Sequence, residues 1–139
     1  SIPTAREWCG VALFAAAESC NMRCHKTLAD AKASSRGGKS RVVLTGKFLF
    51  DMVTSPHYLF EVLSWVGFNA ATGFTLAGVL FNAMGATIMT CYAIENHERC
   101  RAEFGRAYPK RRTPIFPALD LRPPRALVHA LARAPMPTA

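Results

Sequence analysis

The segment Thr54–Glu61 (TSPHYLFE) combines three kinds of side chain that enzymes use to move protons. On a helix, Tyr58, Glu61 and Trp65 follow i, i+3, i+7 spacing and share one face, with His57 at its edge. A long stretch without charge follows, and a carboxylate at membrane depth usually faces a protein interior or a wet cavity. The group is therefore a candidate site. The same spacing also fits Glu61 at a membrane interface and Tyr58 in an aromatic belt.

A second polar group lies in the segment Trp8–Asp30, whose first half is apolar and whose second half is polar. Asn21, His25 and Lys32 recur at helical spacing and lie roughly on one face. This face is a candidate binding surface. It is equally typical of the polar end of a helix that leaves a membrane.

A third group, Glu95–Arg99 (ENHER), follows the uncharged stretch. A continuing helix would carry His97 and Arg101 four residues apart, with Arg99 nearby. Arginine is favoured where phosphate groups are bound, so this group could form a polar rim for an anionic ligand. The alternative is an ordinary solvated helix end.

Two other patterns are incomplete. The GGKS sequence lacks the glycine that a phosphate-binding loop needs five residues before its Gly–Lys pair, because the chain has Ala33 there. The 5 cysteines form no CxxC pair, and Cys20, Cys24 and His25 have no second ligand pair beside them. We therefore predict no metal site.

Helices must position the three polar groups. Residues 62–94 as one helix would be about 50 Å long, against a hydrocarbon core of about 30 Å. Asn69–Gly73 offers a break, which predicts one helix from about His57 to Ala71 and another from about Phe74 to Ile94. With Trp8–Asp30, the sequence predicts an all-α integral membrane domain of about three membrane helices plus a short cytosolic C-terminal helix.

The net charge of +8 is concentrated in residues 32–47 and 99–133, on either side of apolar runs. That distribution favours a membrane protein with its basic loops in the cytosol over a nucleic-acid-binding protein. We expect residues 1–118 to form the membrane domain and residues 119–139, rich in Pro, Ala and Arg, to form a tail. Because the chain begins with Ser, we also expect it to be a piece of a longer protein.

Three segments resemble a known family. RCHKTLADAK (from Arg23), VTSPHYLFEVLSWVGF (from Val53) and NHERCRAEFGRAYPKRRTPIFP (from Asn96) are similar, in this order, to the C-terminal part of the steroid 5α-reductase family. The polyprenol reductase branch resembles the chain most, followed by the trans-2-enoyl-CoA reductase branch. The resemblance implies a multi-pass domain of the endoplasmic reticulum membrane that binds NADPH. It also implies reduction of an α,β carbon–carbon double bond, most simply in polyprenol or polyprenal on the way to dolichol and protein glycosylation.

Matching positions imply roles for individual residues. Tyr58 matches a tyrosine proposed as the proton donor and Glu61 a glutamate near the nicotinamide, so these two are the predicted catalytic residues. The predicted NADPH contacts are Asn21, His25, Lys32, His57, His97 and Arg99. The expected partners are a lipid substrate, the membrane and the N-terminal helices that supply the substrate cavity in this family.

Other functions stay open at this point. The chain could act in very-long-chain fatty acid elongation as a trans-2-enoyl-CoA reductase. A Pro-x-Tyr at a helix start and Phe-Gly-x-x-Tyr near the C-terminus also resemble isoprenylcysteine or phospholipid methyltransferases, which bind S-adenosylmethionine. A non-catalytic fragment is a third alternative, because Glu98 and Cys100 differ from the family pattern.

Overall fold

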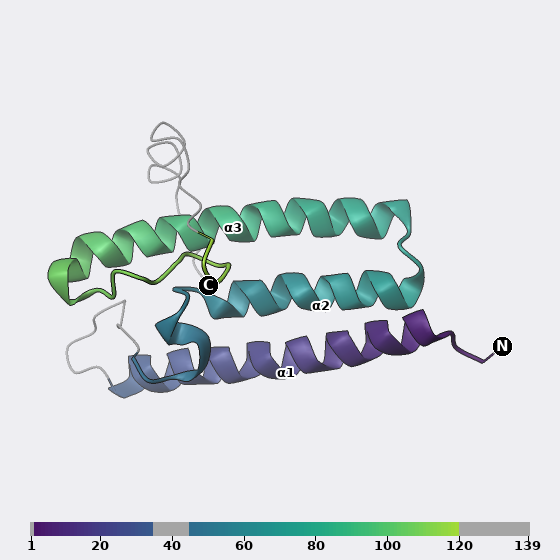
Figure 1. The fold of residues 1–139 in the computed structure, drawn as a ribbon, viewed down its shortest axis with the longest axis horizontal. Helices are drawn as coiled ribbons and strands as arrows, with labels where there is room; N and C mark the ends of the chain where they lie inside the picture. The colour runs from purple at the N-terminus through teal and green to yellow at the C-terminus, as the bar shows by residue number, and fades with distance from the viewer. Residues whose placement is uncertain (1, 35–44, 120–139) are drawn as a thin grey trace.

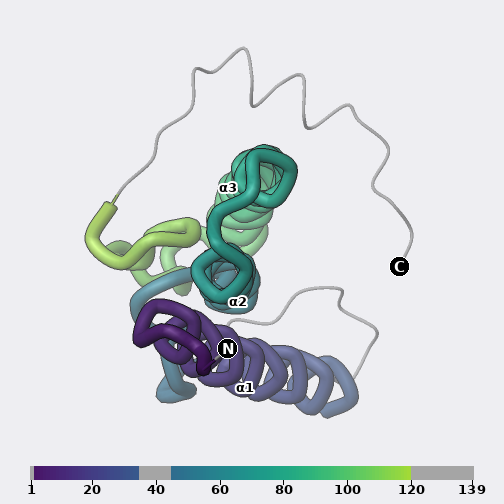
Figure 2. Tube along the Cα trace, turned by 90° about the vertical axis from the view of Figure 1, so that its right-hand side faces the viewer, coloured from purple at the N-terminus to yellow at the C-terminus, as the bar shows by residue number. Residues whose placement is uncertain are grey.

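The computed structural model describes residues 2–34 and 45–119. Within these residues the elements are α1 (Ala5–Ser34), η1 (Phe48–Asp51), α2 (Pro56–Thr72), α3 (Leu76–Phe104) and η2 (Gly105–Ala107). The three α-helices run antiparallel to their neighbours in one layer, with α2 between α1 and α3 (Figures 1 and 2). Consequently α1 ends, α2 begins and α3 ends at the same end of the layer (Figure 1).

Local sequence sets the bounds of α2 and α3. Pro56 occupies the first turn of α2, where its missing N–H leaves no donor unpaired. The helix ends at Gly73, whose φ of 88° is left-handed, and the Phe74 N–H closes the end by donating to the Asn69 carbonyl at 2.8 Å. Thr75 then caps α3 by accepting the Gly78 N–H at 3.2 Å. The break expected within Asn69–Gly73 is thus a turn at the end of that range.

Helix α1 packs closely on α2 through small residues. Gly10, Ala17 and Cys24 are the buried residues of α1, at seven-residue steps. A Cβ added to Gly67 of α2 would lie 2.6 Å from the Phe14 backbone nitrogen, so only glycine permits this approach. Close backbone contact of this kind is typical of helices that pack within a membrane.

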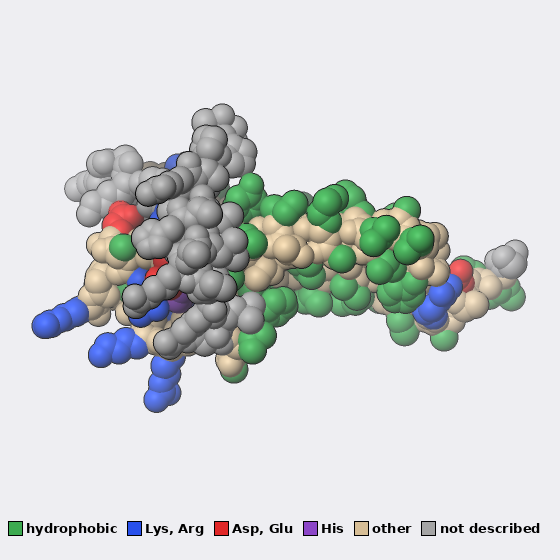
Figure 3. Space-filling model, turned by 90° about the horizontal axis from the view of Figure 1, so that it is seen from above, with side chains coloured by type: hydrophobic (Ala, Val, Ile, Leu, Met, Phe, Trp, Pro, Cys, Tyr) green, Lys and Arg blue, Asp and Glu red, His purple; other side chains and the backbone are tan. Residues whose placement is uncertain are grey.

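Helix α3 contacts α2 mainly near the turn that joins them. Asn69 is fully buried there, and its amide nitrogen donates to the carbonyls of Trp65 at 2.9 Å and Gly78 at 3.2 Å. Most of the large apolar side chains of α3 are exposed, including Leu76, Leu80 and Met84. Apolar side chains cover much of the rod of helices, and Lys and Arg side chains lie at its two ends, with more of them at the left end (Figure 3).

The all-α prediction is confirmed for the described residues, and the helix positions agree within a few residues, except at the C-terminal end of α3. There α3 continues past Ile94 to Phe104, so only the η2 turn follows it in the described part, in place of a separate C-terminal helix. No proline or glycine interrupts residues 95–104, and Gly105 with φ of 50° ends the helix.

Within the described residues one stretch, Leu76–Ala107, is long and apolar enough to cross a membrane. The other two crossings remain predictions. Most of the basic loop (35–44) and the tail (120–139) lie outside the described residues.

Candidate functional site

The segment before α2 is tied to the segment that follows η2. Thr54 N–H donates to the Thr113 carbonyl at 2.8 Å, and Thr113 N–H donates to the Met52 carbonyl at 3.0 Å. Ser55 N–H extends the pairing to the Pro114 carbonyl at 3.1 Å. These backbone bonds hold the segment that returns from the C-terminal end of α3 against the start of α2 (Figure 1).

A buried polar cluster of Thr54, His97 and Tyr108 occupies this junction. The Thr54 hydroxyl lies 2.6 Å from His97 Nδ1 and 2.5 Å from the Tyr108 hydroxyl, which is itself 3.3 Å from His97 Nδ1. His97 and Tyr108 are each 5% exposed, so both depend on protein partners for hydrogen bonds. Nearby, Asn96 Nδ2 donates to the Ser55 hydroxyl at 3.1 Å, which adds a second side-chain tie between α3 and the start of α2.

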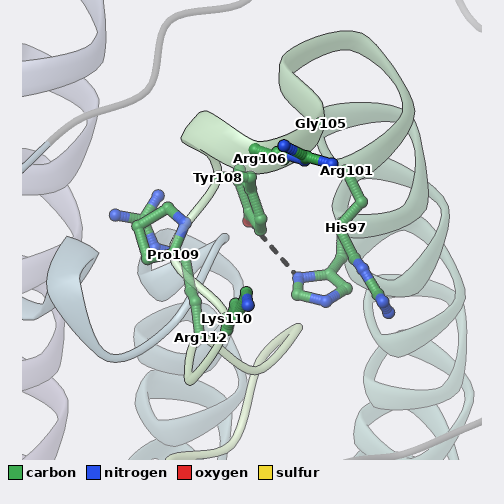
Figure 4. Close-up of a pocket in the computed structure, with 8 residues that line it drawn as sticks. All are labelled: His97, Arg101, Gly105, Arg106, Tyr108, Pro109, Lys110 and Arg112. Carbon is green, nitrogen blue, oxygen red and sulfur yellow. Dashed lines mark hydrogen bonds between the residues drawn. The ribbon is translucent and has the colours of Figure 1, made fainter.

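His97 and Tyr108 form one side of a cavity of about 430 Å³, here called the basic pocket (Figure 4). Its cationic lining consists of Arg101, Arg106, Lys110 and Arg112. None of the described residues that line it is acidic. The arrangement suits an anion with several oxygen atoms, because arginine side chains present paired N–H donors to phosphate.

Tyr108 is held in its protonated form. Burial raises the pKa of its hydroxyl above 10, and the hydrogen bond between Tyr108 and Thr54 and the charge of Arg112 only partly oppose this. The Arg112 guanidinium lies 5.2 Å from the centre of the Tyr108 ring. Tyr108 is therefore a hydrogen-bond donor at neutral pH.

A second, more open hollow of about 660 Å³ lies between α1 and α2 and is here called the side hollow. Its polar lining residues are Glu18, Asn21, His25, Glu61 and Ser64, and three aromatic side chains complete it. Beside it, the rings of His25 and His57 lie 5.2 Å apart between their centres. The Asn21 side-chain oxygen and His57 Nδ1 are both buried without a hydrogen-bond partner among the described residues. Buried polar atoms of this kind are often completed by a ligand or by water.

Glu61 and Trp65 also line a smaller hollow of about 130 Å³ between α2 and α3. Tyr58 is close enough to Glu61 and to Glu95 of α3 for electrostatic interaction, while its ring centre lies 4.2 Å from that of His57. Of the three residues expected on one face, Glu61 and Trp65 line the same hollows, and Tyr58 lies beside them toward α3.

The structure groups the predicted site residues in two places and leaves two outside them. Asn21, His25 and Glu61 line the side hollow with His57 and Tyr58 beside it, and His97 lines the basic pocket. Lys32 is exposed in the last turn of α1. Arg99 forms an ion pair with Glu95, and the basic pocket takes its cations from other positions.

Several residues of the basic pocket were missed from the sequence. Arg106, Lys110 and Arg112 come from the run that contains Tyr108-Pro-Lys-Arg-Arg112, which is basic enough to have been noticed. The contact between Thr54 and Tyr108 joins residues 54 positions apart, and no local spacing signals it.

Comparison with known proteins identifies relatives that match 61–84% of the chain. The chain is 38% identical over 117 residues to the very-long-chain enoyl-CoA reductase of Dictyostelium discoideum, covering 84% of this chain and 38% of that protein. It is 32% identical over 113 residues to polyprenal reductase 2 of Arabidopsis thaliana, covering 80% and 32%. It is 36% identical over 85 residues to a steroid 5-alpha-reductase of Solanum lycopersicum, covering 61% and 32%.

The chain therefore spans about a third of the length of these relatives. No solved structure matches it. The family profile described as 3-oxo-5-alpha-steroid 4-dehydrogenase matches residues 2–119, which include both hollows and all the helices of the structure. With this match and these relatives, the chain belongs to the steroid 5α-reductase family, as its sequence motifs had indicated.

Proposed function

We propose that this chain forms the NADPH-binding part of a membrane reductase that saturates the α,β carbon–carbon double bond of a lipid. The observation that carries the proposal is the basic pocket, with four cationic side chains and no acidic one among its described lining residues. NADPH carries three phosphate groups, and clustered arginines are well suited to hold them. Relatives described as enoyl-CoA, polyprenal and steroid reductases support the same chemistry.

The side hollow fits the other end of this cofactor. The Asn21 side-chain oxygen can accept a hydrogen bond from an amide, and His57 Nδ1 needs a polar partner. A nicotinamide ring carries such an amide and is flat and uncharged enough to lie among the aromatic residues there. We propose that Asn21, His25 and His57 hold the nicotinamide end. His97 and the basic pocket hold the phosphates, with Lys32 and Arg99 as further cofactor contacts.

The reaction adds a hydride to the β-carbon of the substrate and a proton to its α-carbon, and NADPH supplies the hydride when bound. Tyr58 holds the proton, as a phenol close to Glu61 at the start of α2. Glu61 orients the reacting groups from its position between the two hollows that adjoin α2. Apolar and aromatic walls of these hollows exclude water from the reacting atoms.

The substrate proposed first is a polyprenal-type isoprenoid, leading to a dolichol-type product. The 38% identity to the Dictyostelium discoideum enoyl-CoA reductase favours a trans-2-enoyl-CoA as the second candidate. Both substrates place the double bond next to a carbonyl group, so the same residues serve either.

We further propose that all three helices cross the endoplasmic reticulum membrane, with their basic end in the cytosol. The partners are the lipid substrate, the membrane itself and additional helices of the same protein that wall the side hollow. Support comes from the exposed apolar surface of α3 and from the greater length of the relatives.

Two measurements test the function. Titration of the detergent-solubilised protein with NADPH should show saturable binding, whereas S-adenosylmethionine should not bind. Membranes that contain the protein should then consume NADPH with polyprenal or with a trans-2-enoyl-CoA, and product mass identifies the substrate. Binding of S-adenosylmethionine in place of NADPH would contradict the proposal in favour of a methyltransferase. Binding of NADPH without turnover of either lipid would contradict the proposed substrates.

A further inference from the structure

The Thr54 hydroxyl makes more contacts than its single hydrogen can serve. It lies 2.6 Å from His97 Nδ1 and 2.5 Å from the Tyr108 hydroxyl, and its third contact is the Thr113 carbonyl at 3.3 Å. A hydroxyl donates one hydrogen bond and can accept two. The placement of that one hydrogen therefore decides which nitrogen of His97 carries the ring hydrogen.

Two arrangements use the short contact between Thr54 and His97; a third, in which Tyr108 donates directly to Nδ1 of His97 at 3.3 Å, also leaves the ring hydrogen on Nε2. In the first, Tyr108 donates to Thr54, Thr54 donates to Nδ1 of His97, and the ring hydrogen lies on Nε2. In the second, Tyr108 and the Nδ1–H group of His97 both donate to Thr54, which donates to the Thr113 carbonyl. The distances favour the first arrangement. In the second, the Thr54 hydroxyl would donate to the Thr113 carbonyl, which at 3.3 Å is its longest contact.

Two observations support the first arrangement. The Thr113 carbonyl already accepts the Thr54 backbone N–H at 2.8 Å and so does not require the hydroxyl. Burial raises the pKa of Tyr108, which keeps its hydroxyl protonated as the first donor of the chain.

We propose that Thr54 is a positioning residue whose hydroxyl holds neutral His97 in the tautomer with its hydrogen on Nε2, while Tyr108 completes the contacts of that hydroxyl. Both ends of this hydroxyl chain are fixed: Thr54 by backbone bonds to Thr113, and Tyr108 by its contact with Arg112. His97 then presents a permanent N–H donor at the edge of its ring opposite Thr54. The role of that donor toward a cofactor oxygen in the basic pocket rests on the proposed function.

The tautomer can be measured without any ligand. In protein labelled with ¹⁵N and ¹³C histidine, ring-nitrogen shifts correlated with ring-carbon shifts show which nitrogen carries the hydrogen. The measurement is made at pH 8, where an imidazole with an ordinary pKa of about 6.5 is neutral. His97→Gln identifies the His97 signals among the 4 histidines of the chain. We expect hydrogen on Nε2. Hydrogen on Nδ1 in the unaltered protein would overturn the proposal.

Variants of Thr54 test whether the hydroxyl sets the tautomer. Thr54→Val keeps the shape and removes the donor, so the His97 signals should become a mixture of both tautomers, while Thr54→Ser should restore the single form. Tyr108→Phe leaves the bond from Thr54 to His97 in place and should keep the tautomer. Thr27→Val is the matched control, because the Thr27 hydroxyl donates to a backbone carbonyl on the exposed side of α1. An unchanged tautomer in Thr54→Val would also overturn the proposal.

The ligand role is read from NADPH titrations of the same variants. Thr54→Val should raise the NADPH dissociation constant in proportion to the fraction of His97 that leaves the Nε2 form, about twofold for an equal mixture, and Thr54→Ser should leave it unchanged. Weaker binding in Thr54→Val with an unchanged tautomer would contradict positioning. If neither the unaltered protein nor any variant binds NADPH, the proposed function fails. The tautomer of His97 is then decided by the nuclear magnetic resonance measurement alone.

Discussion

The basic pocket and the side hollow differ in how they complete their polar groups. In the basic pocket, His97 and Tyr108 are hydrogen-bonded to Thr54 and are almost fully buried. Beside the side hollow, the Asn21 oxygen and His57 Nδ1 are buried without a partner among the described residues. The first is a preformed site built by contacts between distant segments. The second has a polar lining that a ligand or further protein must complete.

This difference indicates that cofactor binding and the chemical reaction are assigned to different parts of the molecule. A preformed, cationic pocket can hold phosphates before any substrate arrives, and pre-organisation lowers the entropy cost of binding. The side hollow, with Tyr58 beside it, holds the groups proposed to act on the substrate, and its volume of about 660 Å³ exceeds the 430 Å³ of the basic pocket. Changes in the side hollow should therefore alter turnover, and changes in the basic pocket should alter cofactor affinity.

The largest expected effect is that of Tyr58→Phe. Removing the proposed proton donor should lower kcat by a factor of about 10²–10⁴, with the dissociation constant of NADPH nearly unchanged. Steady-state kinetics and NADPH titration measure the two quantities separately. Tyr92→Phe in the facing helix is the control and should keep normal turnover. Equal kcat values for Tyr58→Phe and the unaltered protein would remove Tyr58 from the mechanism.

The next effect concerns the helix crossing beside the side hollow. A Cβ at Gly67 would meet the Phe14 backbone at 2.6 Å, and backbone atoms cannot move aside cheaply. Gly67→Ala should therefore lower the free energy of unfolding by about 2 kcal/mol, measured by thermal denaturation in detergent. Gly85→Ala is the matched control, because a Cβ there meets nothing within 4 Å. That variant should be neutral or slightly stabilising, since alanine is the better helix former.

A smaller effect is expected in the basic pocket. Arg106→Gln removes one cation from its lining and should raise the dissociation constant of NADPH about tenfold while kcat changes little. Arg111→Gln provides the control, because Arg111 is exposed, belongs to the same basic run and does not line the pocket. Titration of both variants with NADPH gives the two dissociation constants to be compared. If the two bind NADPH equally well, the pocket is not the phosphate site.

The sequence predicted the parts of this molecule that depend on local spacing. Helix period alone placed Glu61 and Trp65 on one face, and the turn residues near Gly73 marked the end of α2. The ion pair between Arg99 and Glu95, one helical turn apart, also follows from local spacing. Local pattern could thus predict helices and faces.

The basic pocket could not be predicted in the same way. It forms because Thr54 pairs with Thr113 and Tyr108, residues more than 50 positions further along the chain. Such pairing depends on how α3 returns to the start of α2, which is a property of packing and not of local period. The sequence offered His97 and the basic run as separate signals, and only the fold shows that they line one cavity.

The smallest expected effect is a pH dependence that belongs to the basic pocket alone. The pKa of Tyr108 is raised in the folded protein, so its hydroxyl loses its proton more readily in the unfolded chain. The stabilisation is therefore complete below the unfolded pKa of about 10 and is lost as pH rises from there through the folded pKa. The difference in melting temperature between the unaltered protein and Tyr108→Phe should be constant from pH 7 to 9 and should shrink above pH 10. Tyr58→Phe leaves the Tyr108 cluster intact, so Tyr108 contributes nothing to the difference in melting temperature between this variant and the unaltered protein at any pH. A difference that stays constant to pH 11 would show that Tyr108 is not shielded as the structure indicates, and the contrast between a basic pocket with buried, hydrogen-bonded groups and a side hollow with unpartnered ones would lose its electrostatic basis.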